Sequence, residues 1–229
     1  MEEKRLFDIL KLYIAQYPNQ DVALARKEKN KWVKYSIQEY VETTNYLSYA
    51  FIKLGIQKND KVGIICSNRP EWNMLDMAIM QVGAITVPIY PTISKEDYKY
   101  IVNDCGIKLI VLEGSAVLQK IESIKSEAAN LEAIYSIGTK CDYPTFEELV
   151  NLGKENQNPE ELKQREDSID EKECATIIYT SGTTGNPKGV MLSHYNIMSQ
   201  IHNLKQTPSK WSKKAFSFLP ICHAYERML

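Results

Sequence analysis

Short apolar segments alternate with helix-like segments along the first two thirds of the chain, and this alternation restricts the fold more than any other feature. The apolar segments fall at 61–66, 84–90, 107–112 and 131–137. Apolar runs without alternating polar positions indicate strands that are buried on both faces, as in parallel sheets covered by helices. The sequence therefore predicts an α/β fold in which helices cover parallel-sheet layers.

The helices between these strands are marked by their first residues. Ser36 with Glu39, and Thr145 with Glu148, form capping-box patterns, in which each side chain satisfies a free N–H group of the first turn. Ser94 is a third N-cap candidate. We expect helices over 37–54, 70–82, 95–104 and 116–128.

A polar stretch at 155–173 interrupts the alternation. It is rich in Glu, Gln, Asn, Lys and Asp and contains Pro159. We interpret it as a solvated linker with one exposed helix near 159–165, which divides the chain into 1–154, 155–173 and 174–229. Further strands are expected at 175–179 and 215–219.

Charge and cysteine usage narrow the class of protein. The chain has 28 Lys and Arg against 29 Asp and Glu, a net charge of −1. This balance gives no broad basic face, so nucleic acid is not an expected partner. The five cysteines contain no C-x-x-C pair, and the N-terminus lacks a secretory signal pattern. Reduced thiols, no zinc or other metal site and a cytoplasmic location are therefore expected.

The clearest chemical signal follows the expected strand at 175–179. Residues 180–189 read Thr-Ser-Gly-Thr-Thr-Gly-Asn-Pro-Lys-Gly. Glycines permit close approach of the backbone to a ligand, hydroxyl groups donate hydrogen bonds to anionic oxygens, and Lys188 adds a mobile cation. The alternative is a polar surface turn, because the same residue types form turns. The strand directly before the loop favours a polyphosphate site.

The loop is not a Walker A motif. That motif requires G-x-x-x-x-G-K-[ST]. Pro187 stands where the second glycine is required, and Gly189 follows Lys188 where Ser or Thr is required. An ordinary P-loop NTPase is therefore a poor interpretation.

The loop instead resembles the signature of the adenylate-forming superfamily, T-S-G-[ST]-T-G-x-P-K-G, at every specified position from Thr180 to Gly189. The stretches Ser67-Asn68-Arg69-Pro70-Glu71-Trp72 and 83–92 resemble long-chain acyl-CoA synthetases. So does Leu219-Pro220-Ile221-Cys222-His223-Ala224-Tyr225-Glu226-Arg227, which favours a long-chain fatty acid over short-chain or amino-acid substrates.

This resemblance implies a two-step reaction. A fatty carboxylate attacks the α-phosphate of ATP to give an acyl-adenylate and pyrophosphate, and coenzyme A then displaces AMP to form a thioester. It implies that fatty acid, ATP, Mg²⁺ and coenzyme A are the small molecules involved. The implied nucleotide-binding residues are Thr180, Ser181, Gly182, Thr183, Thr184, Gly185 and Lys188, and Lys188 and His223 are the implied catalytic residues.

The three histidines receive different interpretations. His223 follows Pro220 at the end of an expected strand, where sites gather, and the resemblance implies that it faces the carboxylate or the phosphates of ATP. His194 and His202 are interpreted as structural, and Cys222 as a small apolar filler. Glu226 and Arg227 match the subgroup pattern or cap the next helix.

Measured against the superfamily, 229 residues are few. The resemblance implies that 1–154 is the βα lobe of an adenylating N-terminal domain, and that 174–229 is the phosphate-loop segment and the start of a second lobe. We expect such a fragment to form no acyl-CoA alone and to need the C-terminal part as a partner; a peripheral membrane contact is a further hypothesis for the parent. The alternatives are a non-catalytic nucleotide-binding module, a scaffold fragment or a ligase for a different carboxylate.

Overall fold

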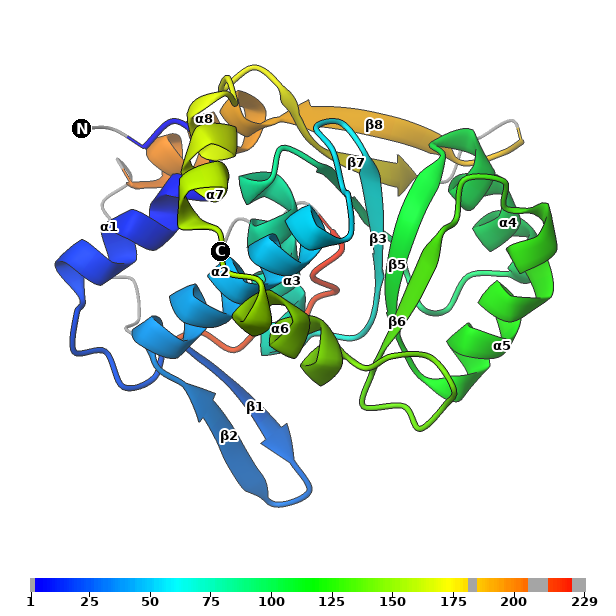
Figure 1. Ribbon diagram of the computed structural model, residues 1–229, viewed down its shortest axis with the longest axis horizontal. Coiled ribbons are helices and arrows are strands. Elements are labelled where there is room, and N and C mark those ends of the chain that lie inside the picture. Colours follow the sequence, from blue (N-terminus) through cyan, green and yellow to red (C-terminus); the bar gives the residue numbers. More distant parts are fainter. Residues whose placement is uncertain (1–2, 181–184, 206–213, 224–229) are drawn as a thin grey trace.

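The fold is built on one mixed sheet. The computed structural model describes residues 3–180, 185–205 and 214–223. Within these ranges, six strands form a sheet in the order β6-β5-β3-β4-β7-β8 (Figure 1). The strands are β3 (Lys61–Ile65), β4 (Ile85–Pro88), β5 (Ile107–Glu113), β6 (Ala133–Ile137), β7 (Cys174–Thr180) and β8 (Lys188–Ser193). All neighbours pair in parallel except β7 and β8, which confirms the predicted α/β fold.

Two helical layers cover this sheet. On one face lie α2 (Ile37–Lys53), α3 (Pro70–Gln81) and α6 (Phe146–Glu155), and on the other α4 (Lys95–Asp104) and α5 (Ser115–Ile124), as Figure 1 shows. Because both faces are covered, β3 and β4 are buried along almost their whole length, as their apolar sequences predict. The expected helix at 116–128 ends earlier, at Ile124, and continues as a 3₁₀ turn over Lys125–Glu127.

The predicted helix caps are confirmed. The side chains of Ser36, Ser94 and Thr145 each accept a hydrogen bond from the backbone N–H three residues later. In each case the third residue, Glu39, Asp97 or Glu148, returns a hydrogen bond to the cap N–H. These local contacts fix where α2, α4 and α6 begin.

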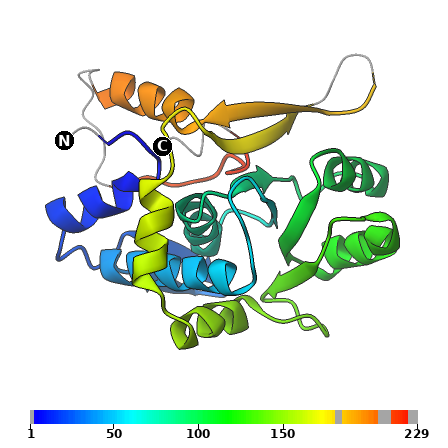
Figure 2. The ribbon, with the colours of Figure 1, turned by 45° about the horizontal axis from the view of Figure 1, so that its top comes forward.

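Further elements outside the sheet pack around the helical layer formed by α2, α3 and α6. They are α1 (Asp8–Gln16), an antiparallel hairpin of β1 (Leu24–Glu28) and β2 (Lys31–Tyr35), α7 (Pro159–Asp167) and α8 (His194–Lys205). In Figure 2 the β7–β8 hairpin and α8 lie along one side of the molecule. Within the described ranges, no helix has the length and apolar character needed to cross a membrane.

The polar stretch before β7 is more closely packed than a solvated linker. The expected helix is present as α7, but Leu162 and Glu166 are each only 5% exposed. Arg165 Nη1 donates to the Ile56 carbonyl at 2.7 Å, and Lys11 pairs with Glu166 at 2.6 Å. The polar helix α7 packs against the molecule because its few inward-facing side chains form ion pairs and hydrogen bonds to the backbone. The division of the chain at 155–173 stays a prediction.

A buried ion network fixes the loop between β3 and α3. Arg69 donates two hydrogen bonds to Glu71, at 2.9 and 3.1 Å, and a third to Glu113 at the end of β5, at 2.5 Å. Arg26 lies 3.3 Å from Glu71, and the Ser67 N–H donates to Glu113 at 3.0 Å. The Arg69 and Glu71 side chains are only 8% and 4% exposed. Charged groups this deeply buried are held by their partners, so the loop has little freedom.

Gly153 provides a direct test of the packing between α2 and α6. A Cβ at this position would lie far inside van der Waals contact with the backbone carbonyl of Tyr46. Gly→Ala within a helix normally stabilises by about 0.5–1 kcal/mol. Here we expect Gly153→Ala to destabilise by roughly 1–3 kcal/mol or more, since α6 must move away from α2. Urea unfolding measures the change, and exposed Glu155→Ala on the same helix is the control. A Gly153→Ala protein as stable as the wild type would contradict this packing.

The ion network predicts a pH-dependent contribution to stability. Burial raises the pKa of Glu71, but hydrogen bonds and charges from Arg69 and Arg26 outweigh it and hold the pKa below the ordinary 4.5. A lowered folded pKa stabilises the protein above the unfolded pKa, and this contribution is lost as the pH falls through the folded value.

We therefore expect Glu71→Gln to destabilise at pH 7 by roughly 2–4 kcal/mol, because Arg69 then keeps only Glu113 as a negatively charged partner. The deficit should shrink as the pH falls below about 4.5. Denaturant unfolding between pH 3 and pH 7 measures it. Glu127→Gln, which breaks an exposed ion pair with Lys99, is the control and should change little. A deficit that is independent of pH would exclude an ionised, paired Glu71.

Candidate functional site

The sheet topology creates a crevice at the carboxyl ends of β3 and β4. The chain leaves β3 toward α3 on one face and leaves β4 toward α4 on the opposite face. Where neighbouring parallel strands send their connections to opposite faces, a crevice forms beyond their carboxyl ends, and ligands bind there. Tyr90, two residues after β4, and Thr180, the last residue of β7, both lie at this edge.

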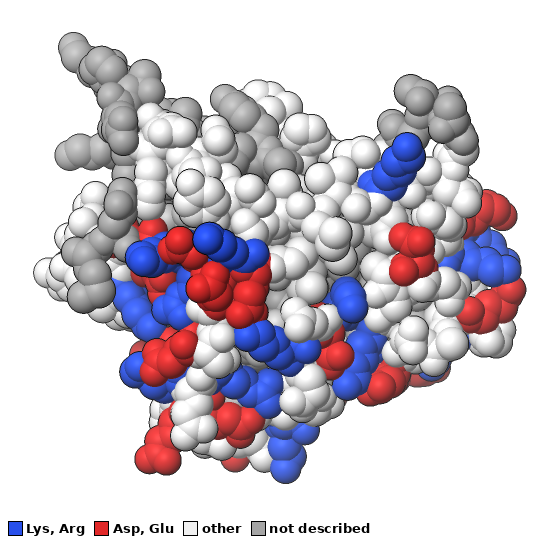
Figure 3. Space-filling view, turned by 90° about the horizontal axis from the view of Figure 1, so that it is seen from above, with Lys and Arg blue, Asp and Glu red and all other residues white. Residues whose placement is uncertain are grey.

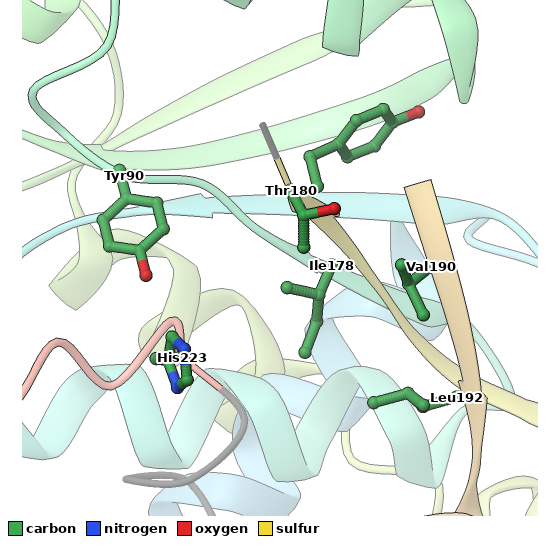
Figure 4. Close-up of a pocket in the computed structure, with 7 residues that line it drawn as sticks. Tyr90, Ile178, Thr180, Val190, Leu192 and His223 are labelled. Carbon is green, nitrogen blue, oxygen red and sulfur yellow. The ribbon is translucent and has the colours of Figure 1, made fainter. Parts of the chain in front are cut away.

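A cavity of about 370 Å³ occupies this edge. Figure 4 shows Tyr90 and His223 on one side, with Ile178, Val190 and Leu192 facing them from the hairpin and Thr180 at the rim. Strand side chains make most of the wall apolar, while the tyrosine, threonine and histidine supply its polar groups. Such a cavity, largely apolar with a few polar groups, is typical of small-molecule sites.

A second cavity of about 340 Å³ adjoins the first. Tyr90, Tyr179 and Thr180 line both cavities, so the end of β7 stands between them. Gly185 and Pro187 from the loop, together with Asp97 of α4, line the second cavity alone. Of the described loop residues, Thr180 therefore lies beside both hollows, and Gly185 and Pro187 lie beside the second.

The signature loop connects β7 to β8. The two strands form an antiparallel hairpin in which Thr180 pairs with Lys188. Gly185 has a φ of +132°, which a side chain would disfavour. Lys188 is exposed at the start of β8 and does not line either cavity in the described part of the chain. Ser181, Gly182, Thr183 and Thr184 lie outside the described residues, so their proposed contacts stay predictions.

Tyr179 ties this hairpin to the helical layer, a contact that the sequence analysis did not identify. Its hydroxyl donates to Asp104 Oδ2 at the end of α4, at 2.6 Å. Burial, and then the hydrogen bond to Asp104, raise the pKa of Tyr179, so the phenol keeps its proton. A Cβ on Gly189 would lie 3.1 Å from Cζ of Tyr179 and 2.8 Å from Ile177. Glycine is thus needed at 189 for the tyrosine ring to lie across β8.

His223 reaches the cavity from an irregular segment, which corrects one prediction. Residues 215–219 were expected to form a strand, but they pair with no strand in the described part of the chain. Phe216 and Phe218 are 78% and 72% exposed, so the apolar sequence does not reflect burial here. The following Ile221 and Cys222 are buried, and the His223 N–H donates to the Pro220 carbonyl at 2.9 Å, which turns the chain toward the cavity.

The other histidines and the cysteines lie in the surroundings described next. His194 is 2% exposed, accepts a hydrogen bond from the Leu6 N–H at 3.3 Å and meets Phe7 edge-on, which confirms its structural interpretation. His202 is half-buried on α8. Burial chiefly raises the pKa of Cys222 to about 11, so the thiol is protonated at neutral pH, as expected for an apolar filler. All five cysteines are free thiols.

The charges on one face of the molecule are mixed. The face in Figure 3 carries acidic and basic side chains in intermingled groups, with a largely uncharged area between them. Among residues 3–180, 185–205 and 214–223, no cluster of three or more His, Cys, Asp or Glu side chains is arranged to hold a metal ion.

Comparison with known proteins agrees with this architecture. The chain is 36% identical over 218 residues to the long-chain-fatty-acid–CoA ligase ACSBG2 of Xenopus laevis, covering 91% of this chain and 29% of that protein. It is 32% identical to fatty acyl-CoA synthetase A of Dictyostelium discoideum, covering 86% of this chain and 30% of that protein. The chain thus spans about three tenths of the length of these relatives.

Solved structures share the fold. A long-chain-fatty-acid-CoA ligase (FadD1) from Archaeoglobus fulgidus matches 100% of this chain and 45% of its own, with a TM-score of 0.79 at 22% identity. The anthranilate CoA ligase AuaEII in complex with anthranoyl-AMP matches 86% of this chain and 36% of its own, with a TM-score of 0.69 at 22% identity.

The family model of the AMP-binding enzymes matches residues 11–229, nearly the whole chain. That match includes the strands of the sheet, the signature hairpin and the segment that carries His223. The chain therefore belongs to the AMP-binding enzyme family.

Proposed function

We propose that this chain carries the ATP-phosphate site of an enzyme that activates a long-chain fatty acid to acyl-adenylate and then to acyl-CoA. The observation that carries the proposal is the position of the signature hairpin. It extends from the carboxyl end of β7 beside two cavities, and His223 faces it across the first of them.

The phosphate contacts follow from the chemistry of the loop. Thr180, Ser181, Thr183 and Thr184 offer hydroxyl donors, and Gly182 and Gly185 let backbone N–H groups turn toward an anion. Lys188 starts the strand after the loop and is exposed, so its flexible side chain can follow the β- and γ-phosphates. Donors arranged in advance around the departing pyrophosphate stabilise the charge that develops on it.

His223 is proposed to act at the carboxylate end of the reaction. It lines the first cavity opposite the β7–β8 hairpin, with Tyr90 beside it (Figure 4). A fatty carboxylate held there lies next to the α-phosphate of an ATP molecule whose outer phosphates occupy the loop. Orienting the two reacting groups lowers the entropic part of the barrier. Coenzyme A then attacks the acyl-adenylate and AMP leaves.

Mg²⁺ fits this proposal as a companion of the nucleotide. The described residues offer no metal cluster of their own, and Mg²⁺ commonly binds through substrate phosphates, water and one or two protein groups. When bound, the ion supplies positive charge to the phosphates. Thr180 and the loop hydroxyls are the protein groups on this chain suited to face it.

The substrate class rests on the relatives and on the ending of the sequence. The first relatives named above are a long-chain-fatty-acid–CoA ligase and a fatty acyl-CoA synthetase. The segment from Leu219 to Arg227 carries the pattern of the long-chain subgroup. We therefore propose a long-chain fatty acid as the carboxylate.

Lys188→Ala tests the phosphate site. We expect it to weaken ATP binding by roughly tenfold or more, about 1.4 kcal/mol, because a charge-assisted hydrogen bond to phosphate is lost. AMP binding should change much less, since AMP lacks the β- and γ-phosphates. Isothermal titration calorimetry on the 229-residue chain measures both affinities. In a longer polypeptide that completes the reaction, the same substitution should abolish most pyrophosphate release.

The control is Lys172→Ala, an exposed lysine just before the opposite end of β7, which removes the same charge. Equal losses of ATP affinity in the two variants would show that only the net charge matters. An unchanged ATP affinity in Lys188→Ala would reject the role of Lys188 in phosphate binding.

A non-hydrolysable acyl-adenylate with sixteen carbons should bind more tightly than one with two carbons. The reverse order would reject a long-chain substrate.

A further inference from the structure

Asn68 links the loop after β3 to the segment that carries His223. Its Nδ2 donates to Ser217 Oγ at 2.8 Å and to the Leu219 carbonyl at 2.6 Å. Its Oδ1 accepts from the Ile221 N–H at 3.0 Å. One amide side chain thus contacts three alternate residues of the same segment, using both of its donor hydrogens and one acceptor position.

The segment needs such a tether because it lacks the support of regular structure. Residues 215–219 pair with no strand in the described part of the chain, and Phe216, Phe218 and Leu219 are exposed. Ile221 and Cys222 are then buried, and the turn after Pro220 brings His223 to the cavity wall. Exposed irregular backbone is normally mobile, so fixed contacts at Leu219 and Ile221 determine where His223 lies.

Asn68 is itself held by neighbours on both sides. The Ser67 N–H bonds Glu113, and the Arg69 side chain bonds both Glu113 and Glu71. The loop therefore presents the Asn68 amide from a buried ionic frame, at the carboxyl end of a central strand. A rigid frame of this kind holds functional groups more accurately than a free loop does.

We propose that Asn68 is a positioning residue that places His223 at the cavity. It acts through the backbone of residues 217–221 and does not line either cavity in the described part of the chain. The inference rests on the proposed function for the importance of His223, but the tether itself is independent of it.

The first test measures the tether on the 229-residue chain. Asn68→Ala should speed hydrogen exchange at the Ile221 N–H at least tenfold and speed thiol labelling of the buried Cys222. The amide of Val111 in the core of β5 should keep its wild-type rate, which distinguishes local release from general unfolding. Asn68→Asp keeps an acceptor for Ile221 and should give intermediate rates. The control is Asn156→Ala, which removes a part-buried amide that caps α6.

The second test measures, by calorimetry, the consequence for binding of the non-hydrolysable sixteen-carbon acyl-adenylate. Asn68→Ala should weaken binding of the sixteen-carbon acyl-adenylate analogue by about the same factor as His223→Ala. The double variant should bind no more weakly than either single variant, because both substitutions remove the same contact of His223 with the ligand. Wild-type exchange at Ile221 in Asn68→Ala would overturn the proposal, as would additive losses in the double variant. If His223→Ala leaves the affinity for this analogue unchanged, the proposed role of His223 fails, and Ile221 exchange still decides whether Asn68 holds the segment.

Discussion

The join between β4 and β7 is the contact on which the site depends. It joins the signature hairpin to the first four strands of the sheet. The Thr176 hydroxyl donates to the Thr86 carbonyl at 2.8 Å, and both residues are completely buried. Leaving the buried Thr176 hydroxyl without a partner would cost free energy, so this bond favours one register of the two strands. In that register Thr180 emerges at the carboxyl edge next to Tyr90.

The rest of the site is held by contacts from three directions. Tyr179 ties the hairpin to the end of α4 through Asp104, and His194 ties the start of α8 to the N-terminal segment through Leu6. Asn68 ties the final described segment to the loop after β3. Each contact joins the edge of the sheet to an element already fixed by the core. The apolar layers thus provide rigidity, and a few polar contacts set the geometry of the edge.

The sequence predicts local structure well and distant contacts poorly. Capping residues and apolar runs locate the main helices and strands because these signals lie within a few residues of the element they define. The strand at 215–219 is wrong because an apolar run becomes a strand only beside a pairing partner. The helix expected near 159–165 exists but is packed against the molecule. Its ion pair of Lys11 with Glu166 joins residues 155 positions apart, and no local pattern reveals it.

In the candidate site, too, the sequence reveals features made of neighbouring residues but not contacts between distant ones. The signature loop is visible in the sequence because its glycines, hydroxyls and lysine are contiguous. Tyr179 and Asn68 are not visible, because their partners lie 75 and 149–153 positions away. His223 was located by its motif, whereas its support by Asn68 required the structure.

The proposed function requires that ATP binds at the carboxyl edge formed by β4 and β7. Titration of the ¹⁵N-labelled chain with ATP, followed by amide chemical shifts, tests it directly. We expect the largest shifts to cluster at Tyr90, at 180–188 and at His223, with little change along β6 and α5. Shifts centred elsewhere, or none at millimolar ATP, would contradict it.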